Sequence, residues 1–314
     1  MRYRTLGKTE LKVSLLSFGS GGPSKLGQNT GLSGKEQNDL IKRVMDLGIN
    51  FIDSSEGYGE SEEILGKGLE GIPRGSYFLA TKSMCRNRHG ELRDPERFSA
   101  AIDRSLKRLG TDYIDIMQFH LLNKDDYDGV VDTLYPVMDK ARTEGKIRFI
   151  GFSEQYKTEP DHRTVTHALK VDPDLWDTVM LKYGILNQYA AKEALPLAQK
   201  NNVGVINMAV IREKLPNPKL LREQIKIWKE EGLLNPIDLD DIDPLGWLIK
   251  GRVKSVVDAG YIFAGDHPGV STVLTGTSSV SHLEDNARAL NLLALPESDT
   301  LKLRSLFSEI AVYI

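Results

Sequence analysis

Eight short apolar segments recur along this chain, and the segments between them have the amphipathic pattern of helices. The apolar segments are LLSFG (15–19), INFID (49–53), YFLAT (77–81), YIDIMQF (113–119), KIRFIGF (146–152), TVMLK (178–182), VGVIN (203–207) and STVLT (271–275). Alternation of strand and helix is typical of βαβ units, whose strands pair in parallel. Because eight such units close a (β/α)8 barrel, we expect an α/β TIM barrel and rank an open, doubly wound sheet second.

The helical pattern is clearest in two of the intervening segments. In 98–110 the apolar residues share one helical face, and Gly110 stands where a helix C-terminus favours glycine. The segment 38–48 has the same pattern and ends at Gly48. Both segments lead into a predicted strand, as a βαβ unit requires.

The two ends of the predicted barrel carry additional segments. Residues 1–14, with a turn at Gly7 and Lys8, indicate a small N-terminal β-hairpin. After the seventh strand, the segment 208–270 is long, with a helical pattern at 221–232 and then an extended loop at 235–247. Long loops in compact proteins are usually functional, so we expect this one to fold over the barrel mouth. Since no linker or change of composition interrupts the chain, residues 1–314 are expected to form a single barrel domain.

Composition narrows the classes of function. The chain is 40% apolar and 27% charged, which is ordinary for a globular protein, and its net charge of −3 comes without a Lys/Arg run that would favour nucleic acid. One cysteine, Cys85, excludes an intramolecular disulfide. No apolar run approaches the roughly 20 residues of a membrane span. From the charge pattern we expect no nucleic-acid partner, and from the missing apolar run no membrane partner. The expected location is cytoplasmic.

Four polar residues stand at or just after the ends of consecutive predicted strands. Asp53, Lys82 and His120 end the second, third and fourth strands, and Tyr58 follows Asp53 on a turn flanked by glycines. Taken singly, each has an ordinary explanation: a loop-capping Asp, a packed Tyr, a buried core His. Together they indicate a site, because barrel enzymes place their chemistry at the carboxyl ends of the strands.

These four side chains can form a proton-donating set. A tyrosine has a pKa of about 10, and a nearby ammonium such as that of Lys82 lowers it. Asp53 can pair with Lys82 and keep it charged despite burial. His120 can donate a hydrogen bond to a substrate oxygen. The set would place the Tyr58 acid beside a polarised carbonyl.

Protonation of an oxygen is half of a reduction, and hydride from a nicotinamide would complete it. The segment GSGGPS (19–24) does not match a Rossmann fingerprint, since Pro23 interrupts the helix start. The helix that follows the eighth strand offers a different phosphate site, where Gly276 permits close approach and Thr277, Ser278 and Ser279 supply hydroxyls. A plain helix N-cap explains these residues equally well.

Taken together, these residues resemble the aldo-keto reductase family along the whole chain. The matching segments are YRTLGKTELKVS, NFIDSSEGYGESEEILGKGL, Thr81-Lys82, SLKRLGTDYIDIMQFH, GKIRFIGFSE and TVLTGTSSVSHLEDN, in the family's order. The resemblance implies a barrel that uses NAD(P)H without a Rossmann domain. It also implies a catalytic tetrad of Asp53, Tyr58, Lys82 and His120, in which Tyr is the acid, Lys and Asp tune it, and His orients the carbonyl.

The positions that hold the nicotinamide carboxamide in the family depart from its pattern. Ser153 is kept, but Glu154 follows it where the family usually has Asn. Met180 replaces a Gln on the sixth strand, and MAV at 208–210 replaces Ser-Pro-Leu.

The residues expected near the adenine and the 2′-phosphate of the cofactor match the family pattern in part. Asn286 corresponds to the family's adenine-contacting Asn, whereas Thr277 and His282 stand near positions where basic residues often hold the 2′-phosphate of NADP. Arg212 could supply a charge from elsewhere. The expected cofactor is NADP, with NAD as the alternative, bound by Ser153, Glu154, Met180, Gly276, Thr277, Ser278, His282, Asn286 and Arg212.

Three functions compete. The first is reduction of a small aldehyde or ketone, or oxidation of the alcohol, by hydride transfer. The second is a cofactor-binding regulatory subunit with little activity, similar to potassium-channel β subunits. The third, a metal-dependent barrel enzyme, needs more strand-end carboxylates or histidines than we find, so no metal is expected. The oligomeric state is left open.

Cys85 is either a reactive thiol beside a cation or a small buried core residue.

Overall fold

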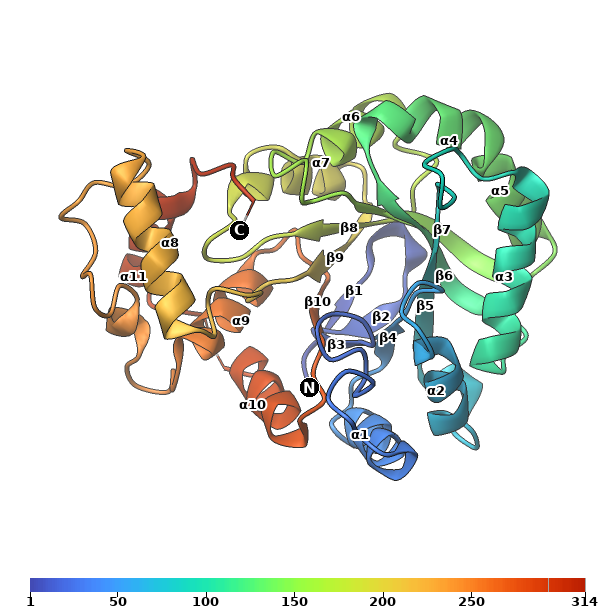
Figure 1. Cartoon of the computed structure of the whole chain (residues 1–314), viewed down its shortest axis with the longest axis horizontal. Helices are drawn as coiled ribbons and strands as arrows, with labels where there is room; N and C mark the ends of the chain where they lie inside the picture. The colour runs from blue at the N-terminus through green and yellow to red at the C-terminus, as the bar shows by residue number, and fades with distance from the viewer. Residues whose placement is uncertain (293, 314) are drawn as a thin grey trace.

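The computed structural model describes residues 1–292 and 294–313. Eight parallel strands close into a barrel in the order β10-β3-β4-β5-β6-β7-β8-β9 (Figure 1). They are β3 (Leu16–Gly19), β4 (Phe51–Asp53), β5 (Phe78–Met84), β6 (Ile114–Leu122), β7 (Ile147–Glu154), β8 (Thr178–Lys182), β9 (Gly204–Met208) and β10 (Thr272–Thr275). Each coincides with one of the eight predicted segments, so the (β/α)8 prediction is confirmed.

Helices surround this barrel on its outer side (Figure 1). They are α1 (Gly34–Asp46), α2 (Ser61–Gly68), α3 (Pro95–Leu109), α4 (Tyr127–Thr133), α5 (Tyr135–Thr143), α6 (Arg163–Val171), α7 (Ala194–Lys200), α8 (Pro218–Glu230), α9 (Val256–Asp266), α10 (Val280–Leu290) and α11 (Glu297–Phe307). Helix α3 shows why the boundaries fall where they do. The side chain of Asp94 accepts hydrogen bonds from two backbone N–H groups of the first turn, and Gly110 ends the helix at φ 61°.

An N-terminal hairpin closes the amino-terminal end of the barrel. Strands β1 (Tyr3–Thr5) and β2 (Lys12–Ser14) pair antiparallel, which confirms the predicted hairpin. Its residues Leu6, Leu11 and Val13 pack in one buried cluster with inward-facing barrel residues such as Phe51, at the start of β4. A cavity inside the barrel can therefore open only at the carboxyl-terminal end of the strands.

Side chains alternate between two apolar layers along each barrel strand. On β5, Leu79 lies in the large cluster between strands and helices, and Ala80 lies in the cluster inside the barrel. Because successive side chains of a strand point to opposite faces, Lys82 also points inward, two residues beyond Ala80 and near the carboxyl end. The same period directs Asp53 inward at the end of β4.

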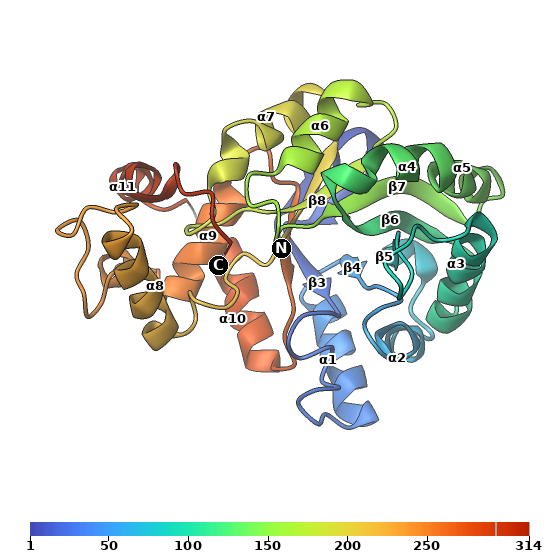
Figure 2. The same ribbon diagram turned by 45° about the horizontal axis from the view of Figure 1, so that its top comes forward.

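The long segment after β9 contributes α8 and an irregular stretch before α9. Helix α8 lies beside α11 and away from the barrel strands in both views (Figures 1 and 2), and the rings of Trp228 and Phe307 join the two helices at a centroid distance of 6.0 Å. Within the described part of the chain, no helix combines the length and the apolarity that a bilayer crossing needs.

Candidate active site

Lys82 lies at the centre of a buried polar cluster at the carboxyl end of β4, β5 and β6. Its Nζ lies 2.5 Å from Asp53 Oδ2 and donates a second hydrogen bond to the Ser54 carbonyl at 2.6 Å. The other carboxylate oxygen of Asp53 accepts from Gln118 Nε2 at 3.2 Å. Burial lowers the pKa of Lys82, but the interactions with Asp53 and then with Tyr58 outweigh it and raise the pKa overall, so the ammonium is retained.

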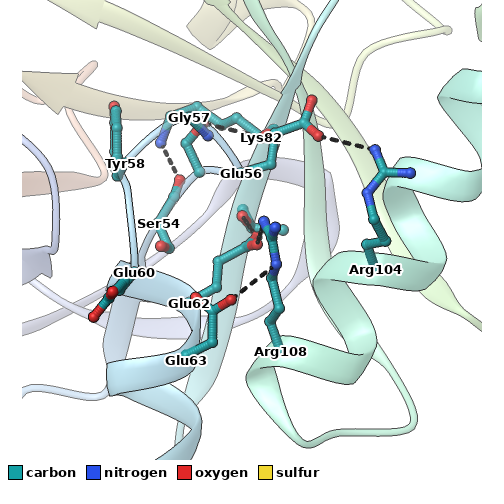
Figure 3. Close-up of polar contacts among 12 residues, drawn as sticks. Ser54, Glu56, Gly57, Tyr58, Glu60, Glu62, Glu63, Lys82, Arg104 and Arg108 are labelled. Atoms are coloured by element: carbon teal, nitrogen blue, oxygen red, sulfur yellow. Dashed lines mark hydrogen bonds and ion pairs between the residues drawn. The ribbon is translucent and has the colours of Figure 1, made fainter.

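Tyr58 lies beside this ammonium. Its ring centroid is 5.2 Å from Lys82 Nζ, and Figure 3 shows Lys82 extending toward the Tyr58 side of the site. Burial raises the pKa of Tyr58, and the Lys82 charge lowers it by less. Lys82 lowers the pKa of Tyr58, as expected from the sequence. The expected net lowering of this pKa is wrong, however, because the phenol is more deeply buried than a strand-end position suggested. Tyr58 is consequently protonated at neutral pH.

His120 faces Tyr58 from the end of β6. The two rings meet edge to face with a centroid distance of 5.6 Å. Burial, and then the charge of Lys82, lower the pKa of His120 to about 3, so its imidazole is neutral at physiological pH. Its Nδ1 lies 2.9 Å from the hydroxyl of Ser55. The structure thus brings all four predicted catalytic residues together.

A cavity of about 1010 Å³ opens over these residues. Asp53, Tyr58, Lys82 and His120 all line it. Its walls carry four cationic side chains and two carboxylates: Lys25, Lys82, Lys157 and Arg212 against Asp53 and Glu213. With Lys82 and Asp53 paired, the remaining wall has an excess of positive charge.

Four of the predicted cofactor residues line this cavity: Ser153, Met180, Arg212 and Gly276. The hydroxyl of Ser153 accepts a hydrogen bond from the N–H of Leu121, which has a left-handed φ of 59° at an irregularity of the β6–β7 pairing. Arg212 Nη1 lies 3.3 Å from the hydroxyl of Tyr156, another wall residue. The wall also includes Ala209 and Pro216, so the first part of the segment after β9 does reach the mouth.

The other five predicted cofactor residues lie outside the cavity wall: Glu154, Thr277, Ser278, His282 and Asn286. Glu154 is fully buried, and its two oxygens contact His162 Nδ1 at 2.8 Å and the N–H of Lys182 at 2.9 Å.

Asn286 is held within the protein by a hydrogen bond from its Nδ2 to Thr275 Oγ1 at 2.9 Å. The hydroxyls that precede α10 are used in its N-terminal turn, where Thr277 Oγ1 accepts from Ser279 N–H and Ser279 Oγ accepts from His282 N–H.

Two further residues of the site were not anticipated from the sequence. Ser55 touches His120, and Gln118 touches Asp53. Gln118 precedes His120 by two residues on β6, and strand alternation therefore places both on the inward face, which is a signal that could have identified it. Ser55 lies in the loop after β4, and its partner depends on loop geometry that no periodicity encodes.

The cavity suits a nicotinamide dinucleotide in size and charge. Its volume of about 1010 Å³ lies at the upper end of the range typical for sites of drug-sized ligands, about 300–1,000 Å³. The excess positive charge complements the phosphates of such a cofactor. A loop carrying Gly21 and Gly22 forms part of the wall, where backbone rather than side chain is presented.

Comparisons with known proteins point to one family over nearly the whole chain. The family model described as the aldo/keto reductase family matches residues 16–307. L-galactose dehydrogenase of Arabidopsis thaliana is 31% identical over 93% of this chain and 89% of its own length. The NADH-specific methylglyoxal reductase of Escherichia coli strain K12 is 27% identical over 98% of both chains.

A solved structure gives the same result for the fold. The holo form of an aldo-keto reductase from Bacillus halodurans superposes with a TM-score of 0.75 at 25% sequence identity, covering 100% of this chain and 98% of the other.

Proposed function

The chain belongs to the aldo/keto reductase family and is an oxidoreductase, and we propose that it reduces the carbonyl of a small aldehyde or ketone with Tyr58 as the proton donor. The observation that carries this proposal is the placement of a protonated, buried phenol between an ammonium and a neutral imidazole on the wall of one cavity. A proton donor must lie within reach of the substrate oxygen, and the cavity provides the space for that oxygen.

Each residue of the site has one task in this reaction. Tyr58 gives the proton of its hydroxyl to the carbonyl oxygen. Lys82 stabilises the phenolate that remains, and Asp53 keeps Lys82 charged and in place. His120 orients the carbonyl oxygen by a hydrogen bond. A nicotinamide held in the cavity would supply the hydride, so that the carbonyl carbon and oxygen would each gain one hydrogen.

The proposed cofactor is NADPH. Its 2′-phosphate adds negative charge, which the excess of cationic side chains on the cavity wall favours over NADH. Ser153, Met180, Gly276 and Arg212 are the residues proposed to hold it, because they line the cavity. A fluorescence titration with NADPH and NADH measures the preference, and tighter binding of NADH would reject this part of the proposal.

The decisive experiment is the Tyr58→Phe variant assayed over a panel of small aldehydes and ketones. We expect the variant to bind the cofactor as the wild type does and to lose about 10²- to 10⁴-fold in kcat, the contribution typical of general acid catalysis. Unchanged turnover would show that Tyr58 is not the proton donor. Cofactor binding without turnover in the wild type would instead favour the regulatory subunit.

A further inference from the structure

The hydroxyl of Ser55 forms a hydrogen bond with Nδ1 of the His120 ring. Ser55 is 1% exposed, and its Oγ lies 2.9 Å from His120 Nδ1. The same oxygen lies 3.1 Å from the Lys82 carbonyl and accepts a hydrogen bond from Gly57 N–H at 3.2 Å. A serine hydroxyl has a single proton, so it can donate to only one of the two neighbours, the imidazole or the carbonyl.

The two choices give opposite tautomers of His120. The ring is neutral, so one nitrogen carries a proton and the other is bare. If Ser55 donates to the Lys82 carbonyl, Nδ1 must be protonated to bond with Ser55, and a bare Nε2 remains. If Ser55 donates to Nδ1, the proton of the ring is on Nε2. Only the second tautomer can donate to a substrate carbonyl, because a carbonyl oxygen can only accept.

The hydrogen bonds around Ser55 favour the second choice. The Lys82 carbonyl already accepts the N–H of Glu56 at 3.0 Å, so it is satisfied without the serine proton. Among the described residues, Ser55 is the one hydrogen-bond partner found for Nδ1. The contact to Nδ1 is also the shorter of the two.

We propose that Ser55 is a positioning residue that holds His120 in the tautomer with its proton on Nε2, and that this proton is donated to the substrate carbonyl. The inference rests on the proposed reductase function for its purpose, but the tautomer itself is a property of the protein without substrate. Ser55 does not touch the reacting atoms and acts through the imidazole.

The test is nitrogen NMR of protein labelled with ¹⁵N-histidine, because bare and protonated imidazole nitrogens have well-separated shifts. A His120→Gln variant identifies the His120 signals among the six histidines of the chain. We expect a bare Nδ1 and a protonated Nε2 in the wild type. A protonated Nδ1 in the wild type would overturn the inference.

Three variants separate the tautomer from packing. Ser55→Ala removes the donor, and we expect mixed tautomers and a fall in kcat of about 10- to 100-fold, by analogy with the loss of the outer hydrogen-bond partner of a metal-binding histidine. Ser55→Thr keeps the hydroxyl and should keep the Nε2–H tautomer and most of the turnover. Ser54→Ala is the control for the tautomer, since it removes a neighbouring buried hydroxyl that bonds to Ser20 instead.

Two results would contradict the role of Ser55: an unchanged tautomer in Ser55→Ala, or mixed tautomers in Ser54→Ala as well. If the wild type shows the Nε2–H tautomer but reduces no carbonyl compound, the proposed function fails. The NMR comparison still decides the role of Ser55 in that case, because it uses no substrate.

Discussion

Lys82 and Asp53 form an ion pair that is almost wholly removed from solvent, with Nζ 2.5 Å from Oδ2 and side-chain exposures of 1% and 4%. Three neighbouring strands fix it: Asp53 ends β4, Lys82 lies on β5, and Gln118 reaches Asp53 from β6. The Ser54 carbonyl accepts a further bond from the ammonium. The ion pair is therefore built on strands rather than on loops, which holds the ammonium at one place beside Tyr58.

Removing one partner of this ion pair should destabilise the protein more than removing both charges. In Lys82→Met the carboxylate of Asp53 is left buried without a cation, and we expect the free energy of unfolding to fall by about 3–5 kcal/mol. In the double variant Lys82→Met/Asp53→Asn no charge is left unpaired, so most of that loss should be recovered. Urea unfolding of the three proteins at pH 7 measures both values. Equal losses in the single and double variants would show that the charge is not the cause.

His120 should make stability depend on pH below neutrality. Its pKa falls from 6.5 to about 3 on folding, so between these values the unfolded chain binds a proton that the folded protein does not. Stability from this group is complete above pH 6.5 and decreases as the pH falls toward 3. Between pH 7 and pH 5 the expected loss is about 2 kcal/mol, since each unit corresponds to ~1.4 kcal/mol.

The measurement for this pH effect is urea unfolding at pH 7 and pH 5 for the wild type and for His120→Gln. We expect the variant to lose about 2 kcal/mol less than the wild type over that interval. An identical pH dependence in both proteins would mean that His120 titrates normally in the folded state.

Glu56, in the loop that carries Tyr58, should contribute more to the stability of the protein than the nearby Glu63 of α2. Glu56 is 9% exposed and contacts Arg93 at 2.5 Å, Arg104 at 3.6 Å and the N–H of Met84 at 3.2 Å. Glu63 is 39% exposed and contacts Arg108 at 3.0 Å. Figure 3 shows both acidic residues facing cationic side chains of α3.

The variants Glu56→Gln and Glu63→Gln test this contrast. We expect the first to lose about 1–3 kcal/mol of stability and to lower kcat, because the loop that carries Tyr58 loses charged hydrogen bonds in a buried place. The second should change stability by less than about 1 kcal/mol, because the ion pair of Glu63 with Arg108 is partly exposed to solvent. Thermal unfolding and turnover of both proteins give the comparison, and equal effects would contradict it.

The fold could be predicted from the sequence because its signals are local and repeated. Each barrel strand is a short apolar run, and helices such as α3 begin at a capping residue like Asp94 and end at a glycine like Gly110. The extended stretch at 235–247 was predicted as irregular and contains only a short 3₁₀ turn at Gly246–Leu248. This stretch does not lie over the barrel mouth as expected, since none of its residues lines the cavity. Ala209 and Pro216, earlier in the segment after β9, do line it.

The site could be predicted only at the level of strand ends. Parallel strands bring their carboxyl ends together, which sufficed to unite Asp53, Lys82 and His120. Which partner each side chain takes depends on rotamers and loop paths, so the Ser55–His120 contact was not foreseen. Burial depth also has no local signal, and for this reason the pKa of Tyr58 moves opposite to the expectation.

Cys85 should be an inert thiol in the native protein. It is 3% exposed, and burial raises the pKa of its thiol to about 12, more than the nearby Arg93 and Arg86 lower it. A thiol reacts as its thiolate, so the reactive form is scarce at neutral pH. The denatured protein should react with a disulfide reagent and release one equivalent of the reagent's thiol. Over the same time we expect no reaction of the folded protein. Equal rates would place Cys85 in an open environment and support the reactive-thiol interpretation of the sequence.

Gly21 should be required to keep Tyr58 in place. A Cβ at this position would lie 2.4 Å from Cε2 of the Tyr58 ring, whereas for a Cβ at Gly57, in the Tyr58 loop itself, the nearest atom beyond its two chain neighbours would be Ser55 Oγ at 3.7 Å. Gly21→Ala therefore has to displace the phenol, and since a shift of about 1 Å in a reacting group can lower the rate about 100-fold, we expect a large fall in kcat.

Gly57→Ala is the matched comparison for Gly21→Ala. Its backbone does not require a positive φ, so the substitution restricts the unfolded chain without strain and should leave stability equal or raise it by up to about 1 kcal/mol. Gly21→Ala should instead lose about 1–3 kcal/mol through overpacking. Turnover and urea unfolding of both variants measure the difference. Full activity in Gly21→Ala would mean that the Tyr58 phenol need not stay beside Lys82 for the reaction to proceed.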